Sequence, residues 1–368
     1  MSSAELNPRR DEGASSDQEV GVPPYYLEES GLLVLKKWID VLKGSSKQGN
    51  TRGIFYDHAL RVKKCNPEGE WLYYRCPDGH FSTWRPFKPC HDHYCPVCSG
   101  RYAKSKGVDA FRRLRAFNAS VGHFVFTIPD KYWELFFDKE MLARLYRIVR
   151  EVLKEFYGGM VGGLNRPHTW GDKKPEWVGK IKSHAHVLIP LLMVKDGEFV
   201  KLPVYLNEKD FVKLRALYRK AFNKEFGFDV PKINVNYSYK RKDQPEKLMN
   251  CCMYVMRPPL ELPLRKSMKK VMLFGKKRLM KVLKHFEFYE GYRSLRWFGF
   301  MARNVIRKYL KLREFLTDQA IDEVLSPFNG KNCPICGKRL EYRAYYKNHK
   351  LVLVDKDPPP LKDARSIK

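Results

Sequence analysis

The chain has 368 residues, 43% of them hydrophobic and 14% aromatic, which argues against a disordered protein and leaves enough apolar side chain for a sizeable core. Its 70 Lys and Arg outnumber 41 Asp and Glu, which gives a net charge of +29. This charge argues against an ordinary enzyme of neutral metabolites and indicates a polyanionic partner, with nucleic acid the first candidate. No run reaches the roughly 18 apolar residues of a membrane span, and the polar start has no signal-peptide core, so we expect a cytoplasmic, DNA-associated protein with no membrane partner.

The first third of the chain is expected to combine a tail, helices and a metal-binding segment. Residues 1–25 are rich in Ser, Glu and Asp and are predicted to be a disordered tail. The amphipathic pattern from Tyr26 to Leu42 predicts a helix, and a basic, helix-like stretch runs from Arg101 to Arg115. Because cysteines and histidines cluster between these two segments, we assign residues 26–115 to a helical and zinc-binding region.

Strands and helices are predicted to alternate across residues 116–262. The apolar segment His123–Pro129 predicts a buried strand, and Asp130 is expected to cap the long helix after it, which Gly158 ends. The remaining elements are a strand at Ser183–Val194, a helix at Glu208–Phe226, a half-buried strand at Ile233–Tyr239 and a short helix at Glu246–Met256. A basic helical region at 263–330 follows, and then a zinc-knuckle-like hairpin and tail at 331–368.

The cysteines are expected to bind zinc, because an intracellular chain does not keep a disulfide framework. Cys95-Pro-Val-Cys98 has the spacing of a zinc knuckle, in which two thiolates share one turn. The preferred set of four ligands is Cys76, Cys90, Cys95 and Cys98, and the competitors are Cys65, His80, His91 and His93. A second knuckle, Cys333 and Cys336, supplies two ligands, which leaves His349, Cys251 and Cys252 as candidates to complete it unless it is an empty relic.

Two further patterns could carry chemistry, although each alone is more typical of packing. His184-Ala-His186 places two imidazoles on the same side of a strand, where they can hold one divalent cation. A helix at 246–256 puts Lys247, Tyr254 and Arg257 roughly along one face, so that two cations flank a phenol, as suits a nearby phosphate. Tyr237 and Tyr239 are the nearest competing tyrosines, on a strand that alternates as a structural one does.

Taken in order, the cysteine cluster, a strand ending in Thr-Ile-Pro, the His-hydrophobic-His strand and the tyrosine helix resemble the HUH superfamily of rolling-circle endonucleases. The closest resemblance is to the rolling-circle insertion-sequence transposases with an N-terminal zinc-binding region, and the plasmid rolling-circle replication initiators come next. The stretches that carry the resemblance include Tyr74-Arg-Cys76, Cys90-x4-Cys95-Pro-x-Cys98, His168-Thr-Trp-Gly171, Tyr254-Val-x-Arg-Pro-Pro259 and Gly291–Gly299.

The resemblance implies an α+β fold: an antiparallel sheet of about five strands with helices on one face, preceded by a small zinc-binding module. It implies that His184 and His186 hold Mg²⁺ or Mn²⁺, and His168 is a possible third ligand on a neighbouring strand. Tyr254 would attack single-stranded DNA and form a 5′-phosphotyrosine, with Lys247 and Arg257 on the phosphates. The expected activity is nicking and joining of DNA during rolling-circle transposition.

Three alternatives stay open. A replication initiator of a plasmid or virus would use the same chemistry, and Asn250, where many relatives carry a second tyrosine or a glutamate, makes the chain resemble a one-tyrosine enzyme with an undefined termination step. A non-catalytic, zinc-dependent nucleic-acid-binding protein would explain the cysteines and the charge but would leave His184, His186 and Tyr254 without a role. A nuclease that activates water would need clustered carboxylates, which the His184-Ala-His186 segment lacks.

Overall fold

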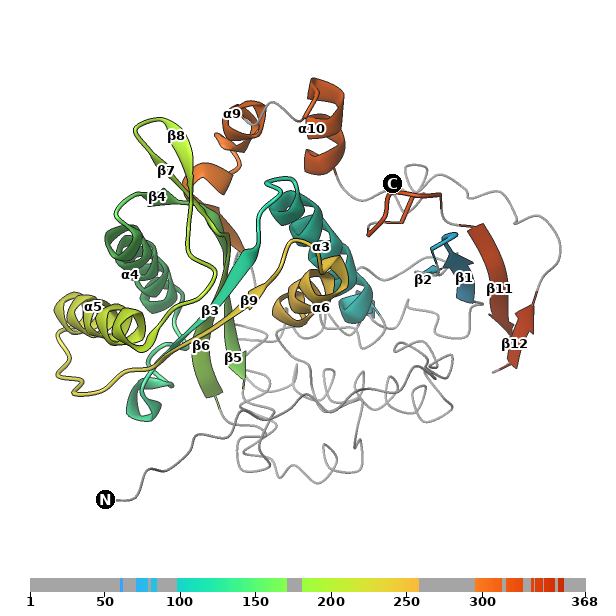
Figure 1. Cartoon of the computed structure of the whole chain (residues 1–368). Coiled ribbons are helices and arrows are strands. Elements are labelled where there is room, and N and C mark those ends of the chain that lie inside the picture. Colours follow the sequence, from blue (N-terminus) through green and yellow to red (C-terminus); the bar gives the residue numbers. More distant parts are fainter. Residues whose placement is uncertain are drawn as a thin grey trace, which may run out of the picture.

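The computed structural model describes residues 60–61, 71–78, 81–84, 98–170, 181–257, 295–312, 316–326, 332–333, 335–339, 341–347 and 350–353 (Figure 1). Several sequence predictions lie outside these ranges, namely the tail at 1–25, the helix at 26–42, residues 263–294 of the basic region predicted at 263–330, and the candidate ligands Cys65, His80, Cys90, His91, His93, Cys95 and His349.

A five-stranded antiparallel sheet forms the centre of the fold and confirms the expected α+β class. Its strands lie in the order β10 (Arg296–Phe298), β5 (Gly163–Trp170), β6 (Ile181–Pro190), β3 (Val121–Thr127) and β9 (Val235–Lys240). Every neighbouring pair is antiparallel, and β6 is the middle strand. The strand with the His-x-His pattern therefore has a partner on each side.

Helices cover both faces of this sheet, so the expectation of helices on one face is wrong (Figure 1). Ala185, Val187 and Ile189 of β6 pack in one apolar cluster with α4 (Lys139–Tyr157) and α5 (Glu208–Phe226). Leu188 packs in a second cluster with α3 (Cys98–Arg115) and α6 (Pro245–Met256). The physical reason is the near-continuous apolar run in β6, since a strand that buries successive side chains needs cover on both sides.

Helix ends follow local capping chemistry, with one correction. Helix α4 begins at Lys139 because the Asp138 carboxylate accepts a 2.8 Å hydrogen bond from the Met141 backbone N–H. Asp130, the expected cap, instead starts the short 3₁₀ helix η1 (Asp130–Tyr132). Helix α5 has the predicted bounds, because Asn207 and Asp210 form a reciprocal capping box at its start.

The segment predicted as one strand from Ser183 to Val194 is two strands. β6 ends at Pro190, and β7 (Leu192–Lys195) joins β4 (Met160–Val161) and β8 (Glu198–Lys201) in a separate three-stranded sheet. Proline has no N–H to donate to a ladder, and the Leu191 N–H turns to the Ser120 carbonyl at 2.7 Å. The break is therefore at the residue where the ladder loses a donor.

A four-stranded sheet joins the two ends of the described chain. Its order is β12 (Lys350–Leu353), β11 (Glu341–Lys347), β1 (Trp71–Arg75) and β2 (Phe81–Trp84). Residue ranges that the sequence assigned to separate regions, 26–115 and 331–368, thus contribute strands to one sheet. Figure 1 shows this sheet beyond α3, away from α4 and α5.

Two short helices, α9 (Ile306–Lys311) and α10 (Asp318–Leu325), link the central domain to this second sheet along the chain. Arginines at the end of α3 hold α10: Arg112 donates to the Ser326 and Glu323 carbonyls, and Arg113 donates to Leu325. These cations meet the negative end of the α10 dipole, so the basic end of α3 has a structural role. Among the described residues, the helices are too short or too polar to cross a membrane.

Candidate metal centre and tyrosine

Three histidines from two adjacent strands meet on the α6 side of the sheet. His184 and His186 lie two residues apart on β6 and so share a face, and His168 of β5 is paired in register with His184. One ring nitrogen from each histidine lies within 4.8 Å of the others. The sequence placed His168 on a strand next to the His-x-His strand, and the pairing of β5 with β6 brings all three candidate ligands together.

Hydrogen bonds to backbone carbonyls orient two of these rings. His184 Nδ1 lies 2.8 Å from the Lys182 carbonyl, and His168 Nε2 lies 2.9 Å from the Val255 carbonyl. A ring nitrogen that donates to a carbonyl leaves the other nitrogen as an electron-pair donor. His168 Nδ1 is buried and has no hydrogen-bond partner, so it fits a metal ion.

A fourth histidine, which the sequence analysis did not select, orients His186. His123 of β3 places Nε2 2.8 Å from His186 Nδ1, and the two rings are stacked. His186 Nε2 then faces His184 Nε2 at 3.1 Å. His123 lies more than 60 residues before His186, so only the pairing of β3 with β6 brings them together.

The centre favours neutral imidazoles. Burial is the main cause that lowers the pKa of His168 and of His186 well below the ordinary value, and the charge of Arg257 lowers both further. Neutral imidazole is the form that binds a metal. Both side chains are buried, with 4% and 2% of their surface exposed, so hydrogen bonds or a metal must satisfy their nitrogens.

Tyr254 lies against this cluster. Its ring centroid is 5.9 Å from that of His168 and 5.5 Å from that of His186. The guanidinium carbon of Arg257 lies 4.7 Å from the Tyr254 ring centroid. A phenol, a cation and a histidine cluster therefore share one site, while Lys247 is exposed about two helical turns earlier on α6.

The packing of α6 fixes where Tyr254 lies. Arg166 of β5 is buried and donates a 2.9 Å hydrogen bond to the Arg257 carbonyl, which holds the end of α6 on the sheet. On the other side, a Cβ at Gly107 of α3 would lie 2.6 Å from Met253 Sδ and 3.3 Å from Met253 Cα. This close approach of α3 and α6 is next to the tyrosine, and no sequence pattern indicated Gly107 or Arg166 as part of the site.

The competing tyrosines face the opposite side of the sheet. Tyr237 and Tyr239 pack against the apolar cluster of α4 and α5. The Tyr237 hydroxyl donates a 2.7 Å hydrogen bond to the Val204 carbonyl, and burial raises its pKa. Neither of them faces the histidines, so of these three candidate tyrosines Tyr254 is the one at the centre.

A second group of candidate ligands consists of cysteines. Cys76, Cys333 and Cys336 have sulfur atoms within 4.8 Å of one another. Cys98 is the first residue of α3. Cys251 and Cys252 are buried on α6 in the core beneath α3, and neither belongs to the group formed by Cys76, Cys333 and Cys336, so the expectation that either might complete the second knuckle is wrong.

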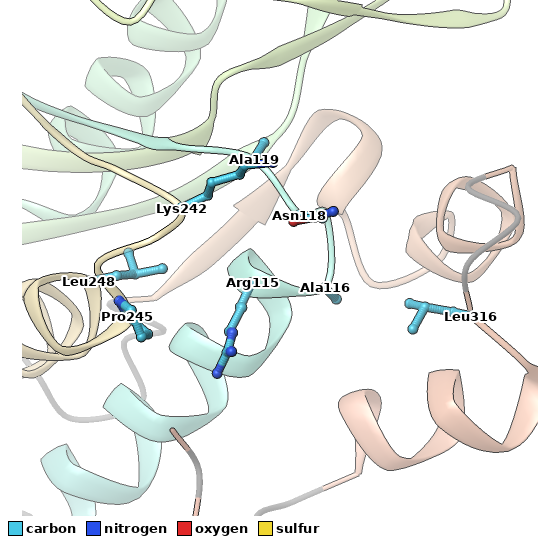
Figure 2. A pocket seen from close by; sticks show the side chains of 8 residues that line it. All are labelled: Arg115, Ala116, Asn118, Ala119, Lys242, Pro245, Leu248 and Leu316. Carbon is cyan, nitrogen blue, oxygen red and sulfur yellow. The ribbon is translucent and has the colours of Figure 1, made fainter. Parts of the chain in front are cut away.

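A pocket of about 260 Å³ lies elsewhere, at the opposite end of α6 from Tyr254 (Figure 2). Figure 2 shows its walls coming from the end of α3, from the segment that leads into α6, and from Leu316. Its polar side chains include Arg115 and Lys242, and its described lining contains no histidine or tyrosine. The pocket is therefore separate from the histidine centre.

Comparisons with family models, with curated proteins and with solved structures find no match to this chain. The geometry of the histidine centre and the residue patterns in the sequence are therefore the features that bear on function.

Proposed function

We propose that the protein cuts and rejoins single-stranded DNA through a covalent link to Tyr254, with a divalent cation held by His168, His184 and His186, in a transposase-like, rolling-circle reaction. One observation carries the proposal: three imidazole nitrogens converge beside a phenol that also has a guanidinium over its ring. Each residue type suits a phosphodiester substrate, and together they form one site.

The ligand set fits a divalent cation, because one nitrogen of His168 is buried without a partner and the rings of His168 and His186 are held neutral. When bound, such a cation acts as a Lewis acid that stabilises negative charge on a phosphate. Three nitrogen donors favour Mn²⁺ over Mg²⁺, since Mg²⁺ prefers oxygen ligands. We therefore expect Mn²⁺ to support activity at lower concentration than Mg²⁺.

The covalent step conserves the number of phosphodiester bonds. The Tyr254 oxygen forms a bond to phosphorus, the bond from phosphorus to the 3′ oxygen breaks, and the phenolic proton ends on the released 3′-OH. Arg257, next to the phenol, supplies a positive charge where the phosphate must lie. Because one ester replaces another, a later 3′-OH can reverse the step and rejoin DNA without ATP.

The chemistry also bears on the alternatives. A replication initiator would use this same site, so the site does not separate it from a transposase. A non-catalytic zinc-dependent binding protein would leave the buried nitrogen of His168 unexplained. A nuclease that activates water is disfavoured, because within the described residues no carboxylate belongs to the histidine group.

The test uses single-stranded DNA, Mn²⁺ or Mg²⁺ and a denaturing gel that retains protein–DNA adducts. We expect wild type to form an adduct, and Tyr254→Phe to lose it while still binding DNA, because only the hydroxyl is removed. Tyr205→Phe is the matched control, since Tyr205 is 71% exposed and contacts Tyr239 on the other side of the sheet. His184→Ala should abolish nicking, and excess Mn²⁺ should restore part of it.

Two outcomes would count against the assignment. A full-strength adduct with Tyr254→Phe would exclude Tyr254 as the nucleophile, and mass spectrometry of the adduct would identify the true residue. Cleavage without any adduct would exclude the tyrosine mechanism altogether. Among active outcomes, joining of the cut strand to a second, target DNA indicates a transposase, whereas release of unit-length circles without such joining indicates an initiator.

A further inference from the structure

We propose that Cys76, Cys333 and Cys336 bind a single zinc ion together, so that one metal fastens an N-terminal strand hairpin to the C-terminal part of the chain. The site is independent of the histidine centre. It also differs from the two separate sites predicted from the sequence. Cys76 was assigned there to the same site as Cys90, Cys95 and Cys98, whereas here it shares a metal with Cys333 and Cys336.

The strand pairing explains why distant cysteines meet. β1 and β11 are antiparallel, and Arg75 at the end of β1 pairs with Glu341 at the start of β11. Cys76 follows β1 directly, while Cys333 and Cys336 lie just before β11. Because antiparallel pairing places the end of one strand beside the start of the other, all three cysteines lie at the same end of the ladder.

The local geometry around Cys333 and Cys336 is that of a metal-binding turn. The Cys333 N–H donates to the Lys338 carbonyl at 2.7 Å, and the Gly337 N–H donates to the Cys333 carbonyl at 2.8 Å. Gly337 has φ of +77°, which favours glycine, and the Lys338 backbone N–H bonds to the Cys336 sulfur. The turn therefore presents both sulfurs on the same side and gives one of them a donor suited to a thiolate.

Contacts across the two chain segments support a shared site. The Cys336 and Cys76 sulfurs lie 3.5 Å apart. Cys76 and Cys333 are 2% and 3% exposed. Next to them, Lys338 Nζ lies 2.5 Å from Asp78 Oδ1, and this ion pair also joins the segment after β1 to the turn before β11. Three converging sulfurs supply three of the four positions of a tetrahedral zinc site.

Zinc stoichiometry of single and double variants tests the sharing directly. Cys76→Ser and Cys333→Ser should each lose one zinc per chain by elemental analysis. The double variant should lose no more than either single, because both cysteines serve the same ion. Cys251→Ser is the matched control, a buried cysteine outside the group that should keep the full zinc content.

A measurement on wild-type protein avoids variants that fail to fold. A chelator is added in steps, and thiol alkylation at each step is mapped by mass spectrometry. Cys76, Cys333 and Cys336 should become reactive together, as one zinc leaves. The proposal is overturned if the double variant loses two zinc ions, if Cys333→Ser loses none, or if Cys76 becomes reactive independently of Cys333 and Cys336.

Discussion

His123 illustrates how a residue that is not a ligand can control one. Its Nε2 lies 2.8 Å from His186 Nδ1, so it can accept a hydrogen bond from the His186 Nδ1–H, and this tautomer leaves His186 Nε2 available to a metal. We expect His123→Phe, which keeps a ring but removes the acceptor, to weaken Mn²⁺ binding about 10–100-fold. His123→Gln should recover part of this loss, because its amide oxygen can accept the same hydrogen bond.

Titration calorimetry with Mn²⁺ measures both His123 variants, and circular dichroism checks that each is folded. Equal Mn²⁺ affinity in His123→Phe and wild type would show that the histidine pair only packs. An equal loss in the Phe and Gln variants would attribute the effect to ring shape and not to the hydrogen bond. The two variants thus separate positioning from packing.

At this scale, local patterns predicted part of the site. His184 and His186 are two residues apart on a strand, and Tyr254 belongs to a helical pattern. A short stretch of sequence is therefore enough to predict on which face each of these side chains lies. His123 and Arg166 were missed because their roles depend on which strands pair. A single histidine on an apolar strand carries no signal of that kind.

At the scale of elements, one carboxylate links α4 and α5, the two helices on the face of the sheet opposite the histidine centre. Glu225 near the end of α5 accepts a 2.8 Å hydrogen bond from Arg144 and lies 2.5 Å from Arg147, both on α4. The hydrogen bond from Arg144, followed by that from Arg147, lowers the pKa of Glu225 below its ordinary value of 4.5. The ionised carboxylate is therefore favoured in the folded state.

This arrangement predicts a pH-dependent loss of stability. Because the folded pKa lies below the unfolded one, the contribution of Glu225 is present above pH 4.5 and is lost as pH falls through the lower folded value. Glu225→Gln should cost about 1 kcal/mol at neutral pH, since the pair is partly exposed. Asp243→Asn is the control, because its ion pair with Arg241 is 56% exposed on both sides.

Thermal melts at several pH values measure these variants. The difference in melting temperature between wild type and Glu225→Gln should be about 2–4 °C at neutral pH and should shrink below pH 4.5. A difference that stays constant down to acid pH would mean that the Glu225 charge does not stabilise the α4–α5 pair.

The sequence predicted elements more reliably than their arrangement. The bounds of α5 and α6 agree within a residue with prediction, because capping residues and helical periodicity are local. The cover of both faces by helices was not predicted, since amphipathicity does not say which face of a sheet a helix joins. Nor was the pairing of β1 with β11, because alternation within a strand does not identify a distant partner.

At the scale of the whole molecule, the net charge of +29 predicts binding to single-stranded DNA that depends strongly on salt. If about five phosphates are neutralised, raising salt from about 50 to 200 mM should weaken binding about 100-fold. Fluorescence anisotropy with a labelled oligonucleotide, at several salt concentrations, gives the slope. Affinity that is flat across this range would contradict an electrostatic interface, even if the catalytic assignment holds.

The pairing of β1 with β11 has a consequence for how the protein is made. Trp71 pairs with Tyr346, so the ribosome must add roughly 270 residues after β1 before its partner exists. At a synthesis rate of about 5–20 residues per second, β1 remains without its partner strand β11 for on the order of 15–50 s. The central sheet, whose strands all lie between Val121 and Phe298, has its full set of strands earlier. Assembly of the nascent chain should therefore finish at its two ends, after the histidines and Tyr254 have already been brought together.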